Sequence, residues 1–426
     1  MNRTQAALSG LPGQPLAGLR VLDFSQVMAG PYCTMLLGDM GADIIKIEPP
    51  GTGDQTRGAM GFKMKGDDSL GFMNLNRNKR SLALDLKTQA GREVVYRLTK
   101  TADIVVENFR PGVMGKLGLD YQTLRDINPG LIYASISGFG QDGPWSHRPG
   151  FDLMAQAMSG VMSVTGHAGG PPVKAGVPVS DIGCALFSVY AILSAYIGRR
   201  EHGEGQYIDT ALMDTAMAFS VWDISEYWGT GRVPSPLGTA NRMSAPYQAV
   251  RASDGYFVMG ATNEKLWHKL CSILNREELL NDPRFTTISL RLANRDVLIQ
   301  ELEKTFALKT RTEWTRLLEA AGLPVGPMLS YAESFESEHA KHRQMRLDIK
   351  RKRCIYPIIP RQPDSWLNPG HGHSTATRPQ FHRPFLPAAG VPVRSAATRR
   401  VRDHWPLPSA ATSTTPHWHV PRRGCH

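Results

Sequence analysis

The sequence predicts an α/β fold, in which a doubly wound parallel sheet is followed by a smaller α+β domain. Short apolar runs alternate with helical patterns over residues 19–140, and strands that alternate with helices form parallel sheets. A chain of 426 residues exceeds one ordinary hydrophobic core, so two domains are expected. From about residue 220 the pattern changes to amphipathic helices, which marks the second domain.

The first domain begins with a strand, a helix and a second strand. Residues 19–24 form a short buried strand pattern, Pro31 stands in the first turn of the next helix, and residues 43–48 predict the second strand. The alternation continues with a strand at 81–86, a helix from about 88 to 99, and strands at 103–109 and 131–140. Successive βαβ units build a doubly wound sheet, whose ligands bind beyond the carboxyl ends of the strands.

The glycine-containing segment "GTGDQTRG" at 51–58 is interpreted as a plain turn. It lacks the third glycine of the dinucleotide-binding GxGxxG pattern and opens no helix. No nicotinamide or flavin cofactor is therefore expected.

The second domain is predicted to be a smaller α+β unit. A long helix and an irregular loop cover residues 222–250, and a strand follows at 255–261. Amphipathic helices are expected at 264–274, 294–310 and 310–321, the last closed by Gly322 and Pro324.

Composition argues against a membrane protein and against a metal protein. The longest mostly apolar run, at 185–198, has about 14 residues where a membrane span needs roughly 18 to 20, so a buried helix is predicted. The N-terminus lacks the continuous apolar core of a secretory signal. Five cysteines lie far apart with no CxxC spacing, which fits a reducing cytoplasm and predicts no metal site.

The net charge of +11 is confined to the C-terminal region. From Lys341 onward there are 16 Lys and Arg against 3 acidic residues, whereas residues 1–340 carry 33 basic and 35 acidic groups. The tail shows neither helical nor strand periodicity. It could be a nucleic-acid-binding arm, a solvated disordered tail, or the product of a changed reading frame near residues 345–355. We favour the last, and no nucleic-acid partner is predicted because aromatic residues are sparse there.

Several motifs occur in order at consistent spacing. They include "VLDFSQVMAGPYCTMLLGDMGADIIKIEPPGTGDQTR", "NRNKRSLALDLK", "ADIVVENFRPGVMGKLGL", "SISGFGQDGP", "GFDLMAQAMSGVMSVTG", "APYQAVRASDGYFVMGA" and "GLPVGPM". Together they resemble the class III CoA-transferases, the family of the carnitine and bile-acid enzymes. The resemblance covers roughly residues 16 to 345.

The resemblance implies a Rossmann-like CoA-binding domain at 16–219, a small α+β domain at 220–330, and the start of a return to the first domain at 331–345. It also implies a homodimer of interlocked chains. Family members end near a Leu-Gly-Glu-His-Thr motif that this sequence lacks. Residues 346–426 are therefore expected to be an aberrant, disordered basic tail rich in Pro, Arg and His.

Family members transfer CoA through an aspartate. Its carboxylate attacks an acyl-CoA thioester, and covalent intermediates carry the acyl group and then CoA. In the family this aspartate stands in a loop that reads Thr-Gly-x-x-Asp-Gly-Pro-Pro. Here the loop is "TGHAGGPP" and Gly169 occupies the matching position.

The related α-methylacyl-CoA racemases offer an alternative site. Their histidine, aspartate and glutamate match Phe151, Asp181 and a position at or near Arg251. Only the aspartate is kept, so racemization is disfavoured. His167, in the loop, is expected to be a surface residue.

Two carboxylates remain as candidate catalytic residues. Asp152 precedes an apolar helical pattern, so its alternative role is that of an N-cap for that helix. Asp181 also precedes a helix and could equally cap it. Because Asp181 matches a position that contacts the thioester in the racemases, we rank it first as nucleophile or acid–base group.

The resemblance also implies CoA-binding residues. The pantetheine path would be lined by Val27, Met28 and Ala29, and the adenine end would lie near Leu84, Asn108 and Phe109. Lys87 and Lys116 would bind the phosphates as charge-assisted donors, although both could also be ordinary solvated surface residues.

The sequence thus predicts a cytoplasmic enzyme that transfers CoA from an acyl-CoA, with succinyl-CoA as a candidate, to a small carboxylic acid. No prosthetic group is expected. The alternatives are a catalytically impaired CoA-binding family member with a disrupted C-terminus, and a racemase-like acyl-CoA isomerase.

Overall fold

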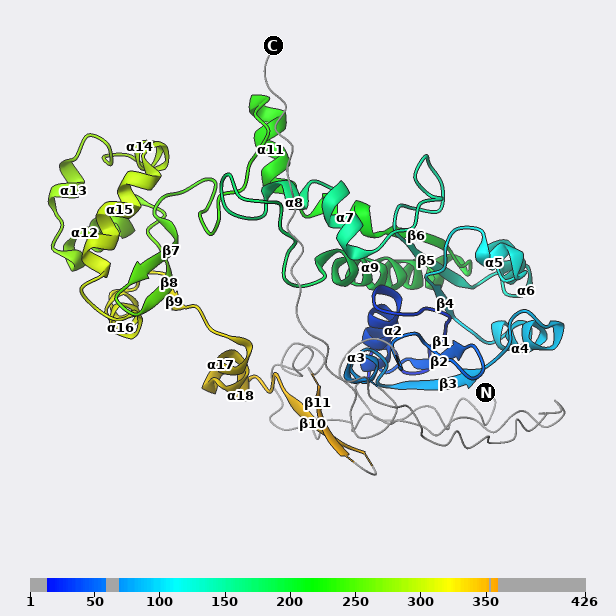
Figure 1. Ribbon diagram of the computed structural model, residues 1–426. Coiled ribbons are helices and arrows are strands. Elements are labelled where there is room, and N and C mark those ends of the chain that lie inside the picture. The colour runs from blue at the N-terminus through cyan, green and yellow to red at the C-terminus, as the bar shows by residue number, and fades with distance from the viewer. Residues whose placement is uncertain (1–13, 59–68, 352–353, 359–426) are drawn as a thin grey trace, which may run out of the picture. The chain divides into compact units, whose positions relative to one another are not determined.

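The computed structural model describes residues 14–58, 69–351 and 354–358. Within these residues, six strands form one parallel sheet in the order β3-β2-β1-β4-β5-β6 (Figure 1). The strands are β1 Arg20–Asp23, β2 Asp43–Glu48, β3 Lys79–Ala83, β4 Ile104–Glu107, β5 Ile132–Ser137 and β6 Tyr207–Ala211. This order places a topological switch point between β1 and β4, as in dinucleotide-binding doubly wound folds. The predicted parallel α/β sheet is confirmed.

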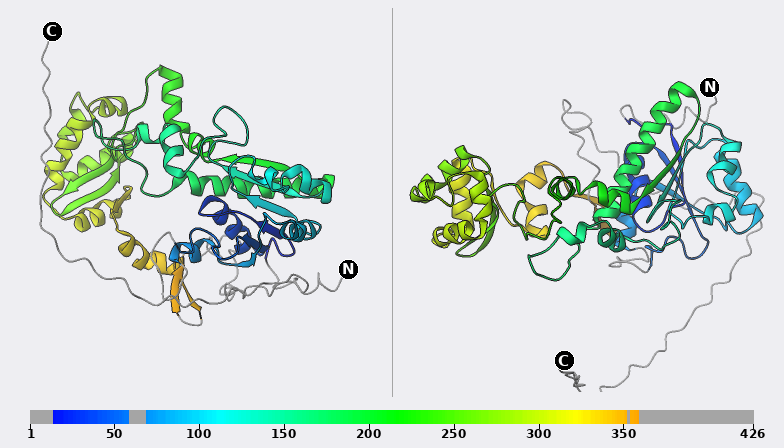
Figure 2. Two further views of the ribbon diagram at one scale, coloured as in Figure 1. Left: turned by 45° about the vertical axis from the view of Figure 1, so that its right-hand side comes forward. Right: turned by 90° about the horizontal axis from the view of Figure 1, so that it is seen from above.

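Helices cover both faces of this sheet. Alternate strand residues such as Val21 and Ile104 pack with helices α2 and α9, whereas Leu22 and Val105 pack with residues of α4, α5 and α6. Seen from above in Figure 2, α9 lies on one side of the strands and the cyan helices lie on the other. The helices of this part are α2 Ala29–Asp39, α3 Leu70–Leu75, α4 Gln89–Thr99, α5 Val113–Lys116, α6 Tyr121–Ile127, α7 Asp152–Met158, α8 Val161–Val164, α9 Val179–His202, α10 Leu212–Ala218 and α11 Val221–Thr230.

A separate core is built from residues 245–323. There β8 (Gly255–Gly260) pairs antiparallel with both β7 (Tyr247–Ala252) and β9 (Val325–Pro327). Buried aromatic side chains such as Trp267 and Phe306 join the strands to the helices. The remaining helices are α12 Glu264–Leu274, α13 Glu278–Asn281, α14 Ile288–Ala293, α15 Arg295–Phe306, α16 Arg311–Ala320, α17 Tyr331–Glu336 and α18 Glu338–His342.

Several strands differ from the prediction. β6 was not predicted, and β7 lies in the segment predicted as an irregular loop. β6 pairs with β5, which lies far away in the chain, so tertiary pairing rather than local pattern decides it. β7 instead pairs with β8 across the two residues 253–254, a local hairpin whose first strand was not recognised in the sequence. β10 (Leu347–Arg351) pairs antiparallel with β11 (Cys354–Ile358), within the region predicted to lack regular structure. The rest of the predicted disordered tail, 359–426, lies outside the described residues.

Helix α9 contains the apolar run that predicted a buried helix. One face is buried, with Cys184 and Ile192 inside the core of the parallel sheet, while Phe187, Tyr190 and Ile197 on other faces are exposed. In length and composition α9 alone, among the described helices, could cross a membrane. Its packing against α2, β5 and β6 is that of a core helix.

Candidate active site

The carboxyl ends of β1 and β4 bring two groups of predicted CoA-binding residues together. Val27, Met28 and Ala29 follow β1 and lead into α2, and Asn108 and Phe109 follow β4. Because β1 and β4 are neighbours at the switch point, these segments lie where doubly wound sheets bind ligands.

The two segments are joined by hydrogen bonds. The Asn108 amide accepts from the Gln26 backbone N–H at 2.8 Å and donates to the Gln26 carbonyl at 2.7 Å. Gly30 permits the close approach of the turn to α2, because a Cβ there would lie 2.2 Å from Ser25 Cβ. Val27 adopts φ +69°, a left-handed conformation that is exceptional for a β-branched residue.

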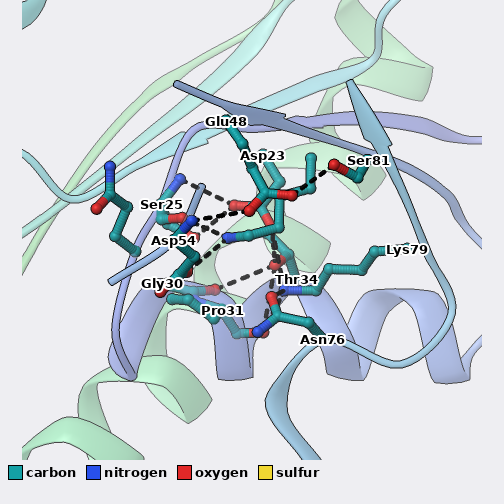
Figure 3. A network of polar contacts seen from close by, with 12 residues as sticks. Asp23, Ser25, Gly30, Pro31, Thr34, Glu48, Asp54, Asn76, Lys79 and Ser81 are labelled. Carbon is teal, nitrogen blue, oxygen red and sulfur yellow. Dashed lines mark hydrogen bonds and ion pairs between the residues drawn. The ribbon is translucent and has the colours of Figure 1, made fainter. Parts of the chain in front are cut away.

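Two lysines and two aspartates are buried together behind this turn (Figure 3). Lys46 Nζ lies 2.9 Å from Asp54 Oδ2 and donates to the Ser25 carbonyl at 2.6 Å. Lys79 Nζ lies 3.0 Å from Asp23 Oδ2 and donates to the carbonyl of Pro31 at 2.8 Å. The charges balance, as buried charges must.

Burial and neighbouring charges both shift the pKa values of this cluster. Burial and the neighbouring Lys46 lower the pKa of Lys79 to about 8, despite the attraction of Asp23. Burial raises the pKa of Asp23, but the charges of Lys79 and Lys46, together with hydrogen bonds from Ser25 and Thr34, outweigh it and hold the pKa below its usual value. Sequence reasoning missed this cluster, because a charged residue in a strand gives no local sign of its partner.

The other predicted CoA-binding residues follow β3 and β4. Leu84 is half-buried directly after β3, and Lys87 and Lys116 are exposed. Neither lysine ammonium group has a hydrogen bond or ion pair with another described residue. Lys87 follows β3, and Lys116 is the last residue of α5; because both are exposed and unpaired among the described residues, both ammonium groups are available to bind an anion.

Glu107, the last residue of β4, is a buried carboxyl that sequence reasoning also missed. It accepts a hydrogen bond from the Phe109 backbone N–H at 2.8 Å. Burial raises its pKa to about 7, although hydrogen bonds from Ser135 and Phe109 oppose the shift. The sequence signal that could have identified Glu107 is an acidic residue at the carboxyl end of an apolar strand.

Asp152 does not cap its own helix, as its alternative role required. The N-cap of α7 is Phe151, and Asp152 stands in the first turn. Its Oδ1 instead accepts hydrogen bonds from the backbone N–H groups of Ser180 at 2.9 Å and Asp181 at 3.4 Å. Asp152 therefore satisfies free amides at the start of α9, 28 residues away in the chain.

Asp181 also differs from an N-cap. The N-cap of α9 is Pro178, and Asp181 is the third residue of the helix. Its half-buried carboxyl group accepts no hydrogen bond from the described residues. Burial, and then the nearby Asp152 charge, raise its pKa to about 7.

Gln156 connects Asp152 to the glycine-rich loop that precedes α9. Its side chain is fully buried, donates to Asp152 Oδ2 at 2.6 Å and accepts from the Ala175 backbone N–H at 2.9 Å. Gly169, in the same loop, is exposed with φ +70°, and no atom lies within 4 Å of its Cβ position. The loop thus offers no carboxylate, and the two aspartates lie at helix starts beside it.

The positions matched to the racemases do not supply their acid–base groups. Phe151 is 64% exposed, and Arg251 lies on β7, where its backbone N–H donates to Glu303. His167 is exposed, as predicted.

Chemically, Asp181 is a carboxylate that is poorly solvated and unsatisfied, which makes it a better nucleophile or base than a fully hydrated one. The described residues include no group of three or more His, Cys, Asp or Glu side chains suited to a metal ion. The described cysteines Cys33, Cys184 and Cys271 are free and buried. The arrangement suits acyl transfer by a carboxylate.

Comparison with known proteins identifies relatives over most of the chain. Residues 16–380 match the family model described as CoA-transferase family III, so the match extends beyond residue 345, where the resemblance was expected to end. The chain is 39% identical to a succinyl-CoA:glutarate CoA-transferase of Mus musculus, over 79% of this chain and 77% of that protein. It is 41% identical to an acetyl-CoA:oxalate CoA-transferase of Acetobacter aceti, over 78% of this chain and 86% of that protein.

A solved structure supports the same relationship. A CAIB/BAIF family protein from Brucella suis superimposes with a TM-score of 0.73 at 40% identity, covering 82% of this chain and 92% of that one. The similarity therefore extends to the three-dimensional fold.

Proposed function

The chain belongs to CoA-transferase family III and is a CoA-transferase, and on this premise we propose that it moves CoA from succinyl-CoA to a dicarboxylic acid by covalent catalysis at Asp181. The observation that carries the proposal is the Asp181 carboxyl group. It is half-buried, accepts no hydrogen bond from the described residues and has a pKa raised to about 7 by burial and by Asp152. A carboxylate in such a state gains most from forming a covalent bond.

In the first half-reaction, an Asp181 carboxylate oxygen attacks the thioester carbonyl carbon. The C–S bond breaks, CoA leaves as a thiolate, and a mixed anhydride remains on Asp181. The thiolate then attacks the aspartyl carbonyl carbon, which releases the donor acid and leaves an aspartyl-CoA thioester.

In the second half-reaction, the acceptor carboxylate attacks the aspartyl thioester and releases the CoA thiolate again. The thiolate attacks the acceptor's carbonyl carbon in the new anhydride, which forms the product acyl-CoA and restores the Asp181 carboxylate. All intermediates are activated acyl groups, so each step is reversible and needs no redox partner.

For CoA we propose the predicted set of residues that follow β1, β3 and β4 in the chain. The turn at 27–29 and the neighbouring Asn108 and Phe109 would bind pantetheine and adenine, and Lys87 and Lys116 would bind the phosphates. The location of the turn at 27–29 and of Asn108 and Phe109 directly after the carboxyl ends of β1 and β4 supports this assignment.

The choice of a dicarboxylic acid follows from the relatives. One is named for glutarate and the other for oxalate as acceptor, and both acids carry two carboxylates. The donors they name differ, so acetyl-CoA is the necessary comparison in any assay.

We further propose a cytoplasmic, interlocked homodimer built from domains at 16–219 and 220–330. A second copy would cover apolar side chains that one chain leaves exposed, including Phe151 at 64%, Tyr190 at 70%, Trp222 at 69% and Trp228 at 76%. The core confined to residues 245–323 supports the second domain.

The test is to incubate the protein with succinyl-CoA and a panel of mono- and dicarboxylic acids, and to trap enzyme-bound acyl groups with hydroxylamine. We expect transfer to dicarboxylates and a hydroxamate at residue 181, located by mass spectrometry. Transfer without any modification at Asp181 would exclude it as the nucleophile.

A further inference from the structure

The backbone at Val27 is held in a conformation that the residue disfavours. At φ +69°, the Cβ of an L-residue crowds its own backbone, and a β-branched side chain makes this worse. Such a conformation persists only where the surroundings over-determine it, and it concentrates at ligand-binding sites.

Side chains form hydrogen bonds with nearly every backbone polar group of residues 25–27. The Ser25 N–H donates to Asp23 Oδ1 at 3.0 Å, and the Ser25 carbonyl accepts from Lys46 Nζ at 2.6 Å. Both backbone groups of Gln26 bond to Asn108, and the Val27 N–H donates to Asp54 Oδ1 at 3.4 Å. Side-chain groups, not strand or helix partners, thus fix three consecutive residues.

Lys46 and Asp54 connect these contacts. Their ion pair of 2.9 Å is buried, with exposures of 1% for each residue. Asp54 is anchored in turn by the N–H of Thr56 at 2.9 Å and its hydroxyl at 2.7 Å. The pair therefore couples the carbonyl of Ser25 and the N–H of Val27 to the segment that follows β2.

Stability alone does not account for this pair. Removing two charges from water costs about as much as their attraction returns, and well-packed apolar residues often stabilise such a site better. The ion pair instead fixes the geometry of the turn that leads into α2.

We propose that Lys46 and Asp54 are positioning residues, which hold Val27 in its left-handed conformation so that the turn at 25–29 presents one fixed surface to CoA. The proposal rests on the assignment of Val27, Met28 and Ala29 to CoA binding. It extends that assignment to two buried residues that do not touch the ligand.

The test exploits glycine, which adopts positive φ without strain. Asp54→Asn should weaken CoA binding at least about fivefold in calorimetric titration, an effect of roughly 1 kcal/mol. In the Val27→Gly background, Asp54→Asn should change the CoA affinity by less than about twofold, because glycine adopts the left-handed conformation without the ion pair. Adding Val27→Ala is the matched control, since it removes most of the side chain but keeps the Cβ and should restore nothing.

Each outcome decides one point. If Asp54→Asn weakens CoA equally in the Val27, Val27→Ala and Val27→Gly backgrounds, the turn binds CoA but the positioning role is overturned. If CoA binds the parent and none of the variants changes its Kd, the assignment of the turn to CoA is wrong, and the inference falls with it.

A milder variant covers the case in which Asp54→Asn does not fold. Thr56→Val removes one anchor of Asp54 and leaves the ion pair intact. It should produce a smaller loss of CoA affinity, which should disappear in the Val27→Gly background and persist in the Val27→Ala background. A loss that neither substitution changes would overturn the proposal.

Discussion

The carboxylate of Asp152 accepts a hydrogen bond from the backbone N–H of Asp181. Through this bond and the one from Ser180, a residue in the first turn of α7 completes the start of α9. Burial, and then the charge of the same Asp152 carboxylate, raise the pKa of the Asp181 side chain. One aspartate therefore positions the other and also adjusts its proton affinity.

The two aspartates should respond differently to the same substitution. Asp181→Asn is expected to abolish transfer and the hydroxylamine-trapped intermediate while CoA still binds, because the nucleophile is removed. Asp152→Asn should keep measurable transfer and lower the free energy of unfolding by about 1 kcal/mol, since the charge at the α9 start is lost. Steady-state assays and urea denaturation of both variants check this.

Two outcomes would contradict these roles of Asp181 and Asp152. Full activity in Asp181→Asn would remove Asp181 from the mechanism, and loss of activity only in Asp152→Asn would reverse the two roles.

Transfer should depend on pH through the ionisation of Asp181. Its pKa of about 7 means that the nucleophilic form is lost below neutrality, so kcat/KM should fall roughly tenfold per pH unit below 7 and level off above it. In Asp152→Asn this midpoint should move to lower pH, because a neighbouring negative charge is removed. A pH profile that is the same in parent and variant would contradict the coupling.

The raised pKa of Asp181 should also make the stability of the protein depend on pH. The folded-state pKa lies above the usual 3.8, so the contribution of Asp181 to stability is full below about pH 4 and is lost as the pH rises through about 7. Relative to the parent, Asp181→Asn should therefore gain stability as the pH is raised from 4 to 8. Thermal denaturation across this range measures the difference, and a constant difference would show that the carboxyl is not perturbed.

The two exposed lysines should affect the donor and not the acceptor. Lys87→Ala and Lys116→Ala are each expected to raise the KM for succinyl-CoA by up to about tenfold, because a charge-assisted bond to phosphate is lost. The KM for the acceptor acid should stay unchanged, and the effect should shrink at high salt. Lys100→Ala, at another exposed position, is the control; an equal change there would indicate a general charge effect.

Activity should not depend on a metal or an added cofactor. The described residues hold no metal-ligand cluster, and carboxylate acyl transfer needs none. We expect the same rate before and after dialysis against EDTA, without nicotinamide or flavin. A loss on chelation that a divalent metal restores would show that the site has been misinterpreted.

The exposed aromatic residues of α11 should be needed for dimerisation. Trp228→Glu should shift the protein from dimer towards monomer in size-exclusion chromatography with light scattering, because a charge would replace an apolar contact. Leu308→Glu is a matched control, since Leu308 and Trp228 are both 76% exposed and Leu308 lies outside α11, after the end of α15. A parent protein that is monomeric at all concentrations would refute the proposed dimer.

The sequence by itself determined the alternation of strands and helices and the family. Strands β1, β2 and β4 and helices such as α12 follow from local apolar periodicity, because neighbouring side chains decide which face is buried. The family followed from motifs that occur in order. The same motifs predicted that Val27 and Asn108 belong to one site, which the switch point between β1 and β4 brings together.

Only the tertiary structure decided what the charged residues do. The local sequence suggested that Asp152 caps the helix it begins. In the structure α7 packs against α9, and the Asp152 carboxylate accepts a hydrogen bond from the first turn of α9 instead. The raised pKa of Asp181 and the pairing of Lys46 with Asp54 also depend on burial by distant segments. Desolvation and ion pairing act through space, so residues far apart in the chain set them.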